Sequence, residues 1–135
     1  IEKTSFVVFH SPQIRIAHKL NLRISNMSVK FDDQVKYLGL IFDSNLIWKP
    51  YLHELSKKIS RGNEVLSKIR YYINRNILLQ LYYALIYPFL TYGLSNWGNT
   101  YSSTLRSLII LQKRAIRTIT FSVPDEHSEP LFKEY

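Results

Sequence analysis

The chain has 135 residues, of which 46% are hydrophobic and 14% aromatic, and it contains no cysteine. Disulfides and thiolate chemistry are therefore excluded, and the aromatic content argues against a disordered chain. The formal net charge is +8, with the positive charge concentrated in residues 49–75 and 101–120. Such blocks are typical of proteins that neutralise phosphates, although a basic soluble protein without a polyanionic partner is an open alternative.

Short β-strands are predicted for the first third of the chain. Residues 4–9 form a β-branched and aromatic run, and residues 20–24 alternate apolar and polar side chains. Another strand is predicted over residues 27–31, joined to the preceding one by a hairpin turn at Ser25 and Asn26. These runs favour a small antiparallel sheet.

The apolar run at residues 35–42 predicts one further strand, in which Gly39 marks a bulge or the close approach of another backbone. Just before it, Asp32 and Asp33 are adjacent, like the metal-binding aspartates of two-metal polymerases. The polymerase pair belongs to an aromatic-x-Asp-Asp hairpin, whereas here an aromatic residue directly precedes the pair and Gln34 follows it. We therefore predict a solvated turn before a strand.

The apolar spacing changes to three and four residues after Pro50, which predicts a helix with that proline in its first turn. Its apolar face consists of Leu52, Leu55, Ile59, Gly62, Leu66, Ile69 and Ile73. We expect Gly62 to let another helix approach closely, because it weakens the helix by about 1 kcal/mol relative to alanine. Lys57, Arg61 and Lys68 lie on the opposite face.

A second helix is predicted to begin after Asn74, a favourable N-cap, and to end near Gly93. Pro88 should kink it. This helix is apolar on nearly all sides, which favours the central member of a helical bundle. The uncharged run at residues 77–97 is also long enough to span a bilayer, so a transmembrane helix is the weaker alternative.

A third helix is predicted to end at Thr120, with Ser102 or Ser103 as its N-cap. Its apolar side consists of Leu105, Leu108, Ile109, Ile116 and Ile119. Its basic stripe, at positions i, i+7 and i+11, consists of Arg106, Lys113 and Arg117. Tyr71, Tyr72 and Tyr101 lie near basic residues and could pack on sugars or bases, but aromatic residues at helical spacing are more often found in the core, so we do not assign them to a site.

Six segments of the chain carry a family resemblance: residues 35–40, 43–48, 81–93, 97–100, 111–117 and 127–132. Together they resemble the region after the palm of reverse transcriptases from LINE-type, Jockey-like retrotransposons. The resemblance implies an α+β fold, with short antiparallel strands followed by a three-helix bundle. Residues 1–47 would be the C-terminal remnant of the palm, residues 48–121 the helical thumb, and residues 122–135 a polar, acidic tail.

The resemblance also implies roles for single residues. Tyr37, Leu38 and Gly39 match the primer grip, a strand turn that steadies the primer end. Lys3 matches the lysine of motif D, which assists the departure of pyrophosphate. The residues that bind nucleotide and Mg²⁺ lie upstream in the family, so no metal is expected in this chain. The complete enzyme would need Mg²⁺.

We therefore expect a non-catalytic piece of an RNA-directed DNA polymerase that holds the RNA/DNA template–primer duplex. Its contacts would be Lys57, Arg61, Lys68, Arg106, Lys113 and Arg117, and its other partners the upstream fingers and palm of the same polyprotein. A helical protein-interaction module, or a relic of an inactive element, is the alternative. The four histidines, His10, His18, His53 and His127, lack the spacing of metal ligands. The location would be intracellular, and nuclear if it follows the parent element.

Overall fold

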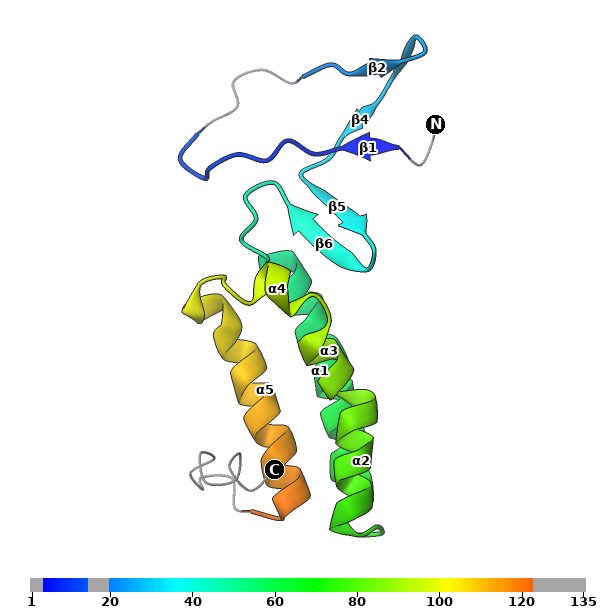
Figure 1. Ribbon diagram of the computed structural model, residues 1–135, viewed down its shortest axis with the longest axis vertical. Helices are drawn as coiled ribbons and strands as arrows, with labels where there is room; N and C mark the ends of the chain where they lie inside the picture. The colour runs from blue at the N-terminus through cyan, green and yellow to red at the C-terminus, as the bar shows by residue number, and fades with distance from the viewer. Residues whose placement is uncertain (1–3, 15–19, 123–135) are drawn as a thin grey trace. The chain divides into compact units, whose positions relative to one another are not determined.

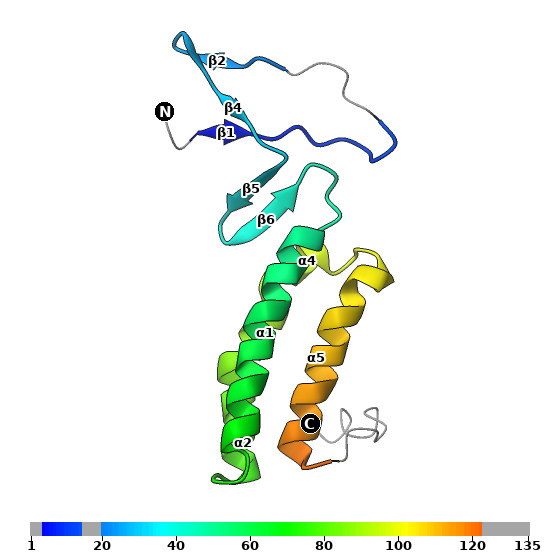
Figure 2. The same cartoon turned by 180° about the vertical axis from the view of Figure 1, so that it is seen from behind.

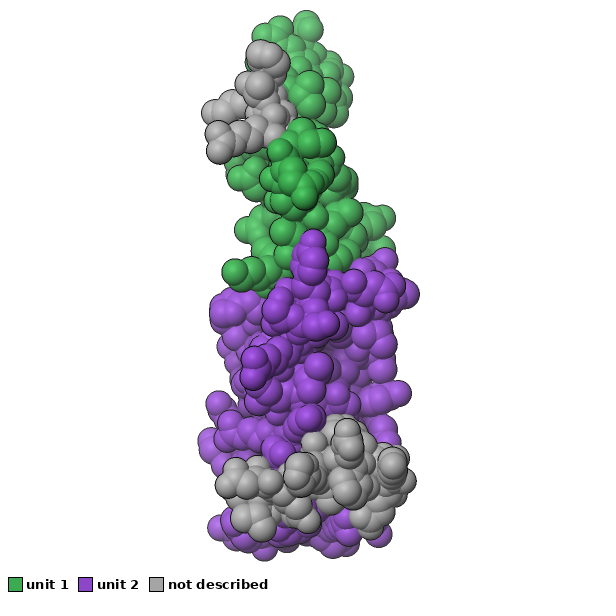
Figure 3. Space-filling model, turned by 90° about the vertical axis from the view of Figure 1, so that its left-hand side faces the viewer, with its two compact units in different colours: residues 1–51 green, residues 52–135 purple. Residues whose placement is uncertain are grey.

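The computed structural model describes residues 4–14 and 20–122. The described chain is α+β, as predicted, with short strands first and helices after them (Figure 1). It divides into two compact units, residues 1–51 and residues 52–135 (Figure 3). Lys3 and all but the first residue of the predicted acidic tail lie outside the described residues.

Three two-stranded ladders make up the described part of the first unit. They are β1 (Ser5–Phe6) with β4 (Lys30–Phe31), β2 (Arg23–Ile24) with β3 (Met27–Ser28), and β5 (Gln34–Tyr37) with β6 (Leu40–Asp43). The predicted β2–β3 hairpin is confirmed, and its turn residues Ser25 and Asn26 have φ values of 48° and 64°. The β1–β4 pair is parallel rather than antiparallel. The long connection between these two strands allows this, because parallel pairing needs a crossover of a dozen or more residues.

The prediction of one continuous strand over residues 35–42 is wrong, because the chain reverses at Leu38 and Gly39 to form the β5–β6 hairpin. These two residues have φ values of 46° and 82°. Two consecutive positive φ values are typical of the two-residue hairpin turns that fit the twist of the flanking strands. Gly39 therefore serves the turn rather than a bulge, and Leu38 adopts the left-handed conformation at a cost of about 1–2 kcal/mol.

A carboxylate organises the segment between β6 and the first helix. Asp43 accepts hydrogen bonds from the backbone N–H groups of Ile47 and Trp48 at 2.9 and 2.8 Å. Leu46 and Trp48 both have positive φ values, 52° and 65°, and such residues need support from their surroundings. The Trp48 ring is buried and packs against Phe42 with ring centroids 5.0 Å apart.

Five helices follow: α1 (Lys49–Ile69), α2 (Arg75–Leu85), α3 (Tyr87–Thr91), α4 (Leu94–Trp97) and α5 (Ser102–Thr120). Within the second unit, α5 runs in the same direction as α1, and α2 runs the opposite way (Figures 1 and 2). The helical core includes Leu52, Leu55, Ile59, Leu66, Leu78, Ile86, Leu108, Ile116 and Ile119, all buried. Asn63 is also buried, and its Nδ2 donates to the Leu111 carbonyl of α5 at 2.9 Å.

The predicted close approach at Gly62 is confirmed. A Cβ atom on Gly62 would lie 2.7 Å from Cγ1 of Ile86, which is fully buried at the junction of α2 and α3. A second contact joins α1 and α3, because the Lys58 ammonium lies 5.4 Å from the centre of the Phe89 ring. The α1 seam therefore packs against the α2–α3 junction, and glycine is the residue that this spacing permits.

The predicted second helix is broken rather than kinked. Asn74 caps α2 as predicted, since its side chain accepts from the Ile77 N–H at 3.0 Å. The helix stops at Ile86, and α3 begins with Pro88 in its first turn. Proline removes one helical hydrogen bond and clashes with the carbonyl four residues earlier, which explains the break. Gly93 has φ 64° at the end of α3, as predicted for a helix terminus, but the short α4 that follows was not predicted.

Two boundary predictions are wrong. α1 ends at Ile69 rather than at Ile73, and α5 begins at Ser102 with Tyr101 as its N-cap and no side-chain cap. One core assignment also fails, because Ile109 is 48% exposed. Across residues 4–14 and 20–122, no helix combines the length and hydropathy that a membrane span requires.

Candidate nucleic-acid interface

The basic stripe of α5 lies on the side of the helix away from the core. Arg106 is exposed, and Lys113 and Arg117 are half-buried. The buried residues of this helix, Leu108, Ala115, Ile116, Thr118 and Ile119, occupy the other side. At 1.5 Å per residue the stripe extends over about 16 Å, which is close to five phosphate steps along one nucleic-acid strand. The structure therefore places three predicted cations in one line.

The sequence that contains this stripe carries charge of one sign. No acidic residue occurs in the sequence between Glu64 and Asp125. α5 additionally carries an exposed cation, Arg114, which the i, i+7, i+11 pattern did not include. Arg114 is eight residues after Arg106, which places it about 80° around the helix from Arg106. It therefore widens the basic surface. In the sequence, Arg114 could have been recognised as part of the basic surface because it directly follows Lys113.

The second candidate surface is the outer face of α1, where Lys57, Arg61 and Lys68 are all exposed. It is less uniformly basic than α5. The Lys57 ammonium binds the Glu54 carboxylate at 2.8 Å, and this hydrogen bond lowers the pKa of Glu54. Both side chains are about half exposed, so the pair contributes little to stability. A polyanion would compete with Glu54 for Lys57.

The predicted primer grip lies at the tip of the β5–β6 hairpin. Tyr37, Leu38 and Gly39 are all exposed there. Tyr37 is the last residue of β5, after Lys36, and Leu38 and Gly39 form the turn. This is a strand turn, as the family resemblance implied, and a primer grip here stays a prediction.

Asp32 and Asp33 lie in a bend directly before β5, as predicted from their sequence context. Asp32 forms an ion pair with Lys30 at 2.8 Å, and the hydrogen bond from Lys30 lowers the pKa of Asp32. Within the described part of the chain, no three His, Asp or Glu side chains gather as metal ligands do. His18 and His127 lie outside that part.

An aromatic cluster that the sequence analysis favoured as core lies exposed at one end of the second unit. Tyr71 and Tyr72 are 77% and 86% exposed, so the preference for the core is wrong. Tyr101, favoured as core for the same reason, is 67% exposed. The cause for the first two is the early end of α1 at Ile69, because residues beyond it lie in a turn rather than on a helical face.

An apolar pocket of about 350 Å³ lies between α3–α4 and α5. Its lining includes Tyr87, Leu90, Leu94, Trp97, Leu108 and Ile109. Ile109 is half exposed because it lines this pocket instead of packing into the core. The predicted apolar side of α5 is thus divided between the core and the pocket.

Short strand ladders followed by helices with a basic outer surface define an α+β protein with a surface suited to polyanions. Neither a protein-family model nor a solved structure matches this chain. A curated protein does: the chain is 30% identical over 93 residues to "Probable RNA-directed DNA polymerase from transposon BS" of Drosophila melanogaster. The match covers 64% of this chain and 10% of that protein.

The chain is therefore a distant relative of part of a retrotransposon reverse transcriptase, as the sequence motifs predicted. It spans about a tenth of the length of the relative that it matches.

Proposed function

We propose that this chain is part of a LINE-type, Jockey-like reverse transcriptase and that its helical unit, as the thumb, holds the RNA/DNA template–primer duplex. The observation that carries the proposal is the α5 stripe of Arg106, Lys113 and Arg117, which faces away from the core. No acidic residue occurs in that helix to compete with phosphates for these side chains. Contacts of this kind read phosphates rather than bases, so binding would tolerate any sequence.

The first unit would act next to the duplex as the C-terminal part of the palm, with residues 1–47 belonging to it and residues 48–121 to the thumb. Tyr37, Leu38 and Gly39 would steady the primer end, since the exposed turn leaves the backbone of Gly39 open to close approach. Nucleotide binding and the chemistry supplied by Mg²⁺ would belong to other parts of the complete enzyme. Holding is the role proposed for the residues of this chain.

The test is the salt dependence of binding to an RNA/DNA hybrid. For B-form DNA, log affinity falls with log salt, and each neutralised phosphate makes this slope steeper by about 0.9. If six cations contact phosphates, the affinity should therefore fall about a thousandfold between 50 and 200 mM salt. Fluorescence anisotropy of a labelled hybrid measures this. An affinity that changes less than about tenfold over that range would refute the electrostatic mechanism.

A second candidate function is a helical protein-interaction module, and two observations favour it. The pocket beside α5 is mainly apolar, and Tyr83 and Tyr87 on α2 and α3 are both nearly half exposed. The rings of these two tyrosines also contact each other, with centroids 5.2 Å apart. Such a surface suits an apolar protein partner, for example another part of the same polyprotein. Both alternatives, a protein-interaction module and a relic of an inactive element, predict no salt-dependent binding to the hybrid.

A further inference from the structure

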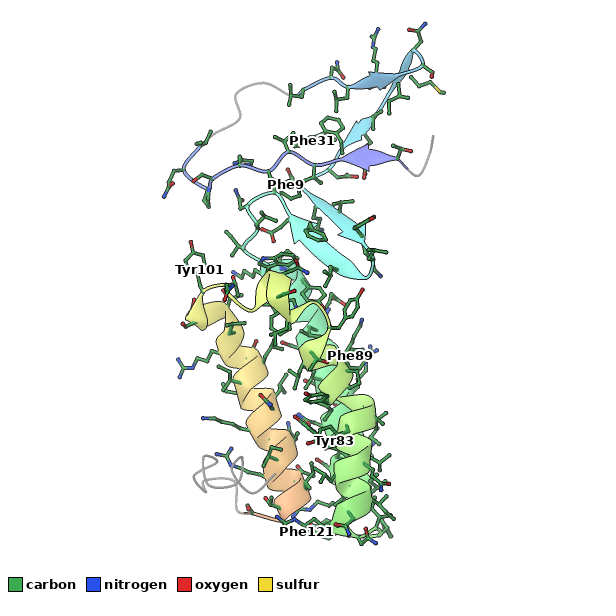
Figure 4. The ribbon with its side chains drawn as sticks, viewed as in Figure 1. Phe9, Phe31, Tyr83, Phe89, Tyr101 and Phe121 are labelled. Carbon is green, nitrogen blue, oxygen red and sulfur yellow. The ribbon has the colours of Figure 1, made fainter. Side chains whose placement is uncertain are left out.

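A cationic and aromatic cluster closes the end of the second unit where α1 turns into α2. We define this end cluster as Arg70, Tyr71, Tyr72 and Phe121. The Arg70 guanidinium lies 5.0 Å from the centre of the Tyr71 ring and 4.8 Å from that of Phe121. The two rings also meet edge to face, with centroids 6.4 Å apart. Figure 4 shows Phe121 at the end of α5 opposite to Tyr101.

Backbone hydrogen bonds hold the residues of the end cluster in position. The N–H groups of Arg70 and Tyr72 donate to the carbonyls of Leu66 and Ile69, at 3.0 and 2.9 Å. Phe121 has φ 58°, a conformation that bulky residues rarely adopt, and it ends α5 with its N–H bonded to the Arg117 carbonyl. Because tyrosine and phenylalanine have only two side-chain torsions, a held backbone presents their rings at little further entropic cost.

The rings of the cluster stay exposed to solvent despite these contacts. Among the large apolar side chains that the structure describes, Tyr72 is the most exposed at 86%, and Phe121 is 46% exposed. Burying a tyrosine in the core would stabilise the fold. Two adjacent tyrosines that face solvent therefore indicate a binding surface. The charged residues within four positions of Tyr71 or Tyr72 in the sequence are all cationic, namely Lys68, Arg70 and Arg75. An anionic partner with flat apolar faces complements both properties.

We propose that the end cluster binds unpaired bases of single-stranded nucleic acid, with Tyr72 and Tyr71 stacking on bases while Lys68 and Arg70 attract the adjacent phosphates. Stacking of this kind is tolerant of sequence, because every base has a flat aromatic face. The proposal rests on the nucleic-acid-binding function proposed above and adds a distinct ligand. The α5 stripe would bind the phosphates of paired strands, whereas the end cluster would bind unpaired bases outside the duplex.

The experiment compares a thymidine 12-mer with an abasic 12-mer of equal phosphate number, each titrated into the full chain. Wild-type protein should bind the thymidine strand about five- to tenfold more tightly, the lower range for base–aromatic stacking. Tyr72→Ala should weaken this preference, with Tyr71 left to stack, and Tyr72→Phe should keep it because the ring remains. Tyr101→Ala is the matched control, since Tyr101 is 67% exposed at the opposite end of α5 and should leave the preference unchanged.

Equal affinity of the wild-type protein for both strands would overturn the proposal, and so would an equal loss of preference in Tyr101→Ala. An RNA/DNA hybrid in the same assay separates the two hypotheses. If the hybrid binds with steep salt dependence but bases make no difference, the end cluster proposal fails alone. If neither strand nor hybrid binds, both proposals fail. Thermal melts of each variant should match the wild type, because the replaced side chains are exposed.

Discussion

Replacing Arg106, Lys113 and Arg117 together by glutamine is expected to weaken binding to an RNA/DNA hybrid by about a hundredfold at 0.1 M salt. Three phosphate contacts would be lost, so the slope of log affinity against log salt should fall by about three. Glutamine has nearly the same helix propensity as lysine and arginine but no charge, and the three positions face away from the core. The measurement is hybrid anisotropy at several salt concentrations, together with a helical melt.

The matched control replaces Arg23, Lys30 and Lys49 by glutamine, which removes the same amount of charge from exposed positions of the first unit. None of these residues belongs to a candidate site. The control should change the slope by less than one, because none of these three residues is proposed to contact a phosphate. Equal losses in the two triple variants would show that net charge, rather than the α5 stripe, determines binding.

Replacing Gly62 by valine is expected to lower the free energy of unfolding by about 2–3 kcal/mol, within the usual range for overpacking a core. The new Cβ would lie 2.7 Å from Cγ1 of Ile86. Ile86 is fully buried, so it cannot move its side chain into solvent. Valine also replaces a weak helix former, and this small gain does not offset the clash. Thermal and urea unfolding followed by helical circular dichroism measure the loss.

Two comparisons isolate this contact. Ala84→Val places the same β-branched side chain at an exposed position of α2 and should cost less than 1 kcal/mol. Ile86→Ala removes the atom that the new side chain would meet, so the double variant should be less destabilised than the sum of the single variants. Unchanged stability in Gly62→Val would mean that α1 and the α2–α3 junction do not approach closely.

The helical part of the fold was largely predictable because its signals are local. A seam of apolar residues fixed the buried face of α1, and Asn74 and Gly93 marked helix ends through capping chemistry. Gly62 was informative because a glycine inside a strong helical pattern needs a reason, and the Ile86 contact supplies it. Each of these residues acts on neighbours that the sequence pattern already defines.

The errors come from residues whose conformation depends on tertiary context. Leu38 adopts a left-handed conformation in the β5–β6 turn, which few non-glycine residues do, so the local residue pattern did not indicate the reversal and only the family resemblance implied a turn there. Pro88 indicated a distortion but not whether the helix would bend or stop. Ile109 has the right spacing for the core and instead lines a pocket whose other wall comes from α3 and α4.

The candidate site was predictable to the extent that charge pattern determines it. Arg106, Lys113 and Arg117 share a face because helical periodicity requires it, whichever core the helix packs against. For Tyr71 and Tyr72 the core was favoured over a surface contact because the apolar spacing continued to Ile73, while the helix ended at Ile69. A four-residue difference in one helix end thus separates a core assignment from a surface cluster.

The central claim, that basic helical faces hold the duplex, is tested most directly by lysine acetylation of the full chain with and without a saturating RNA/DNA hybrid. Mass spectrometry reads each lysine separately. The account predicts that Lys57, Lys68 and Lys113 become protected while Lys30, exposed in the first unit, reacts as before. Equal acetylation of Lys113 in the free and the hybrid-bound chain would contradict it.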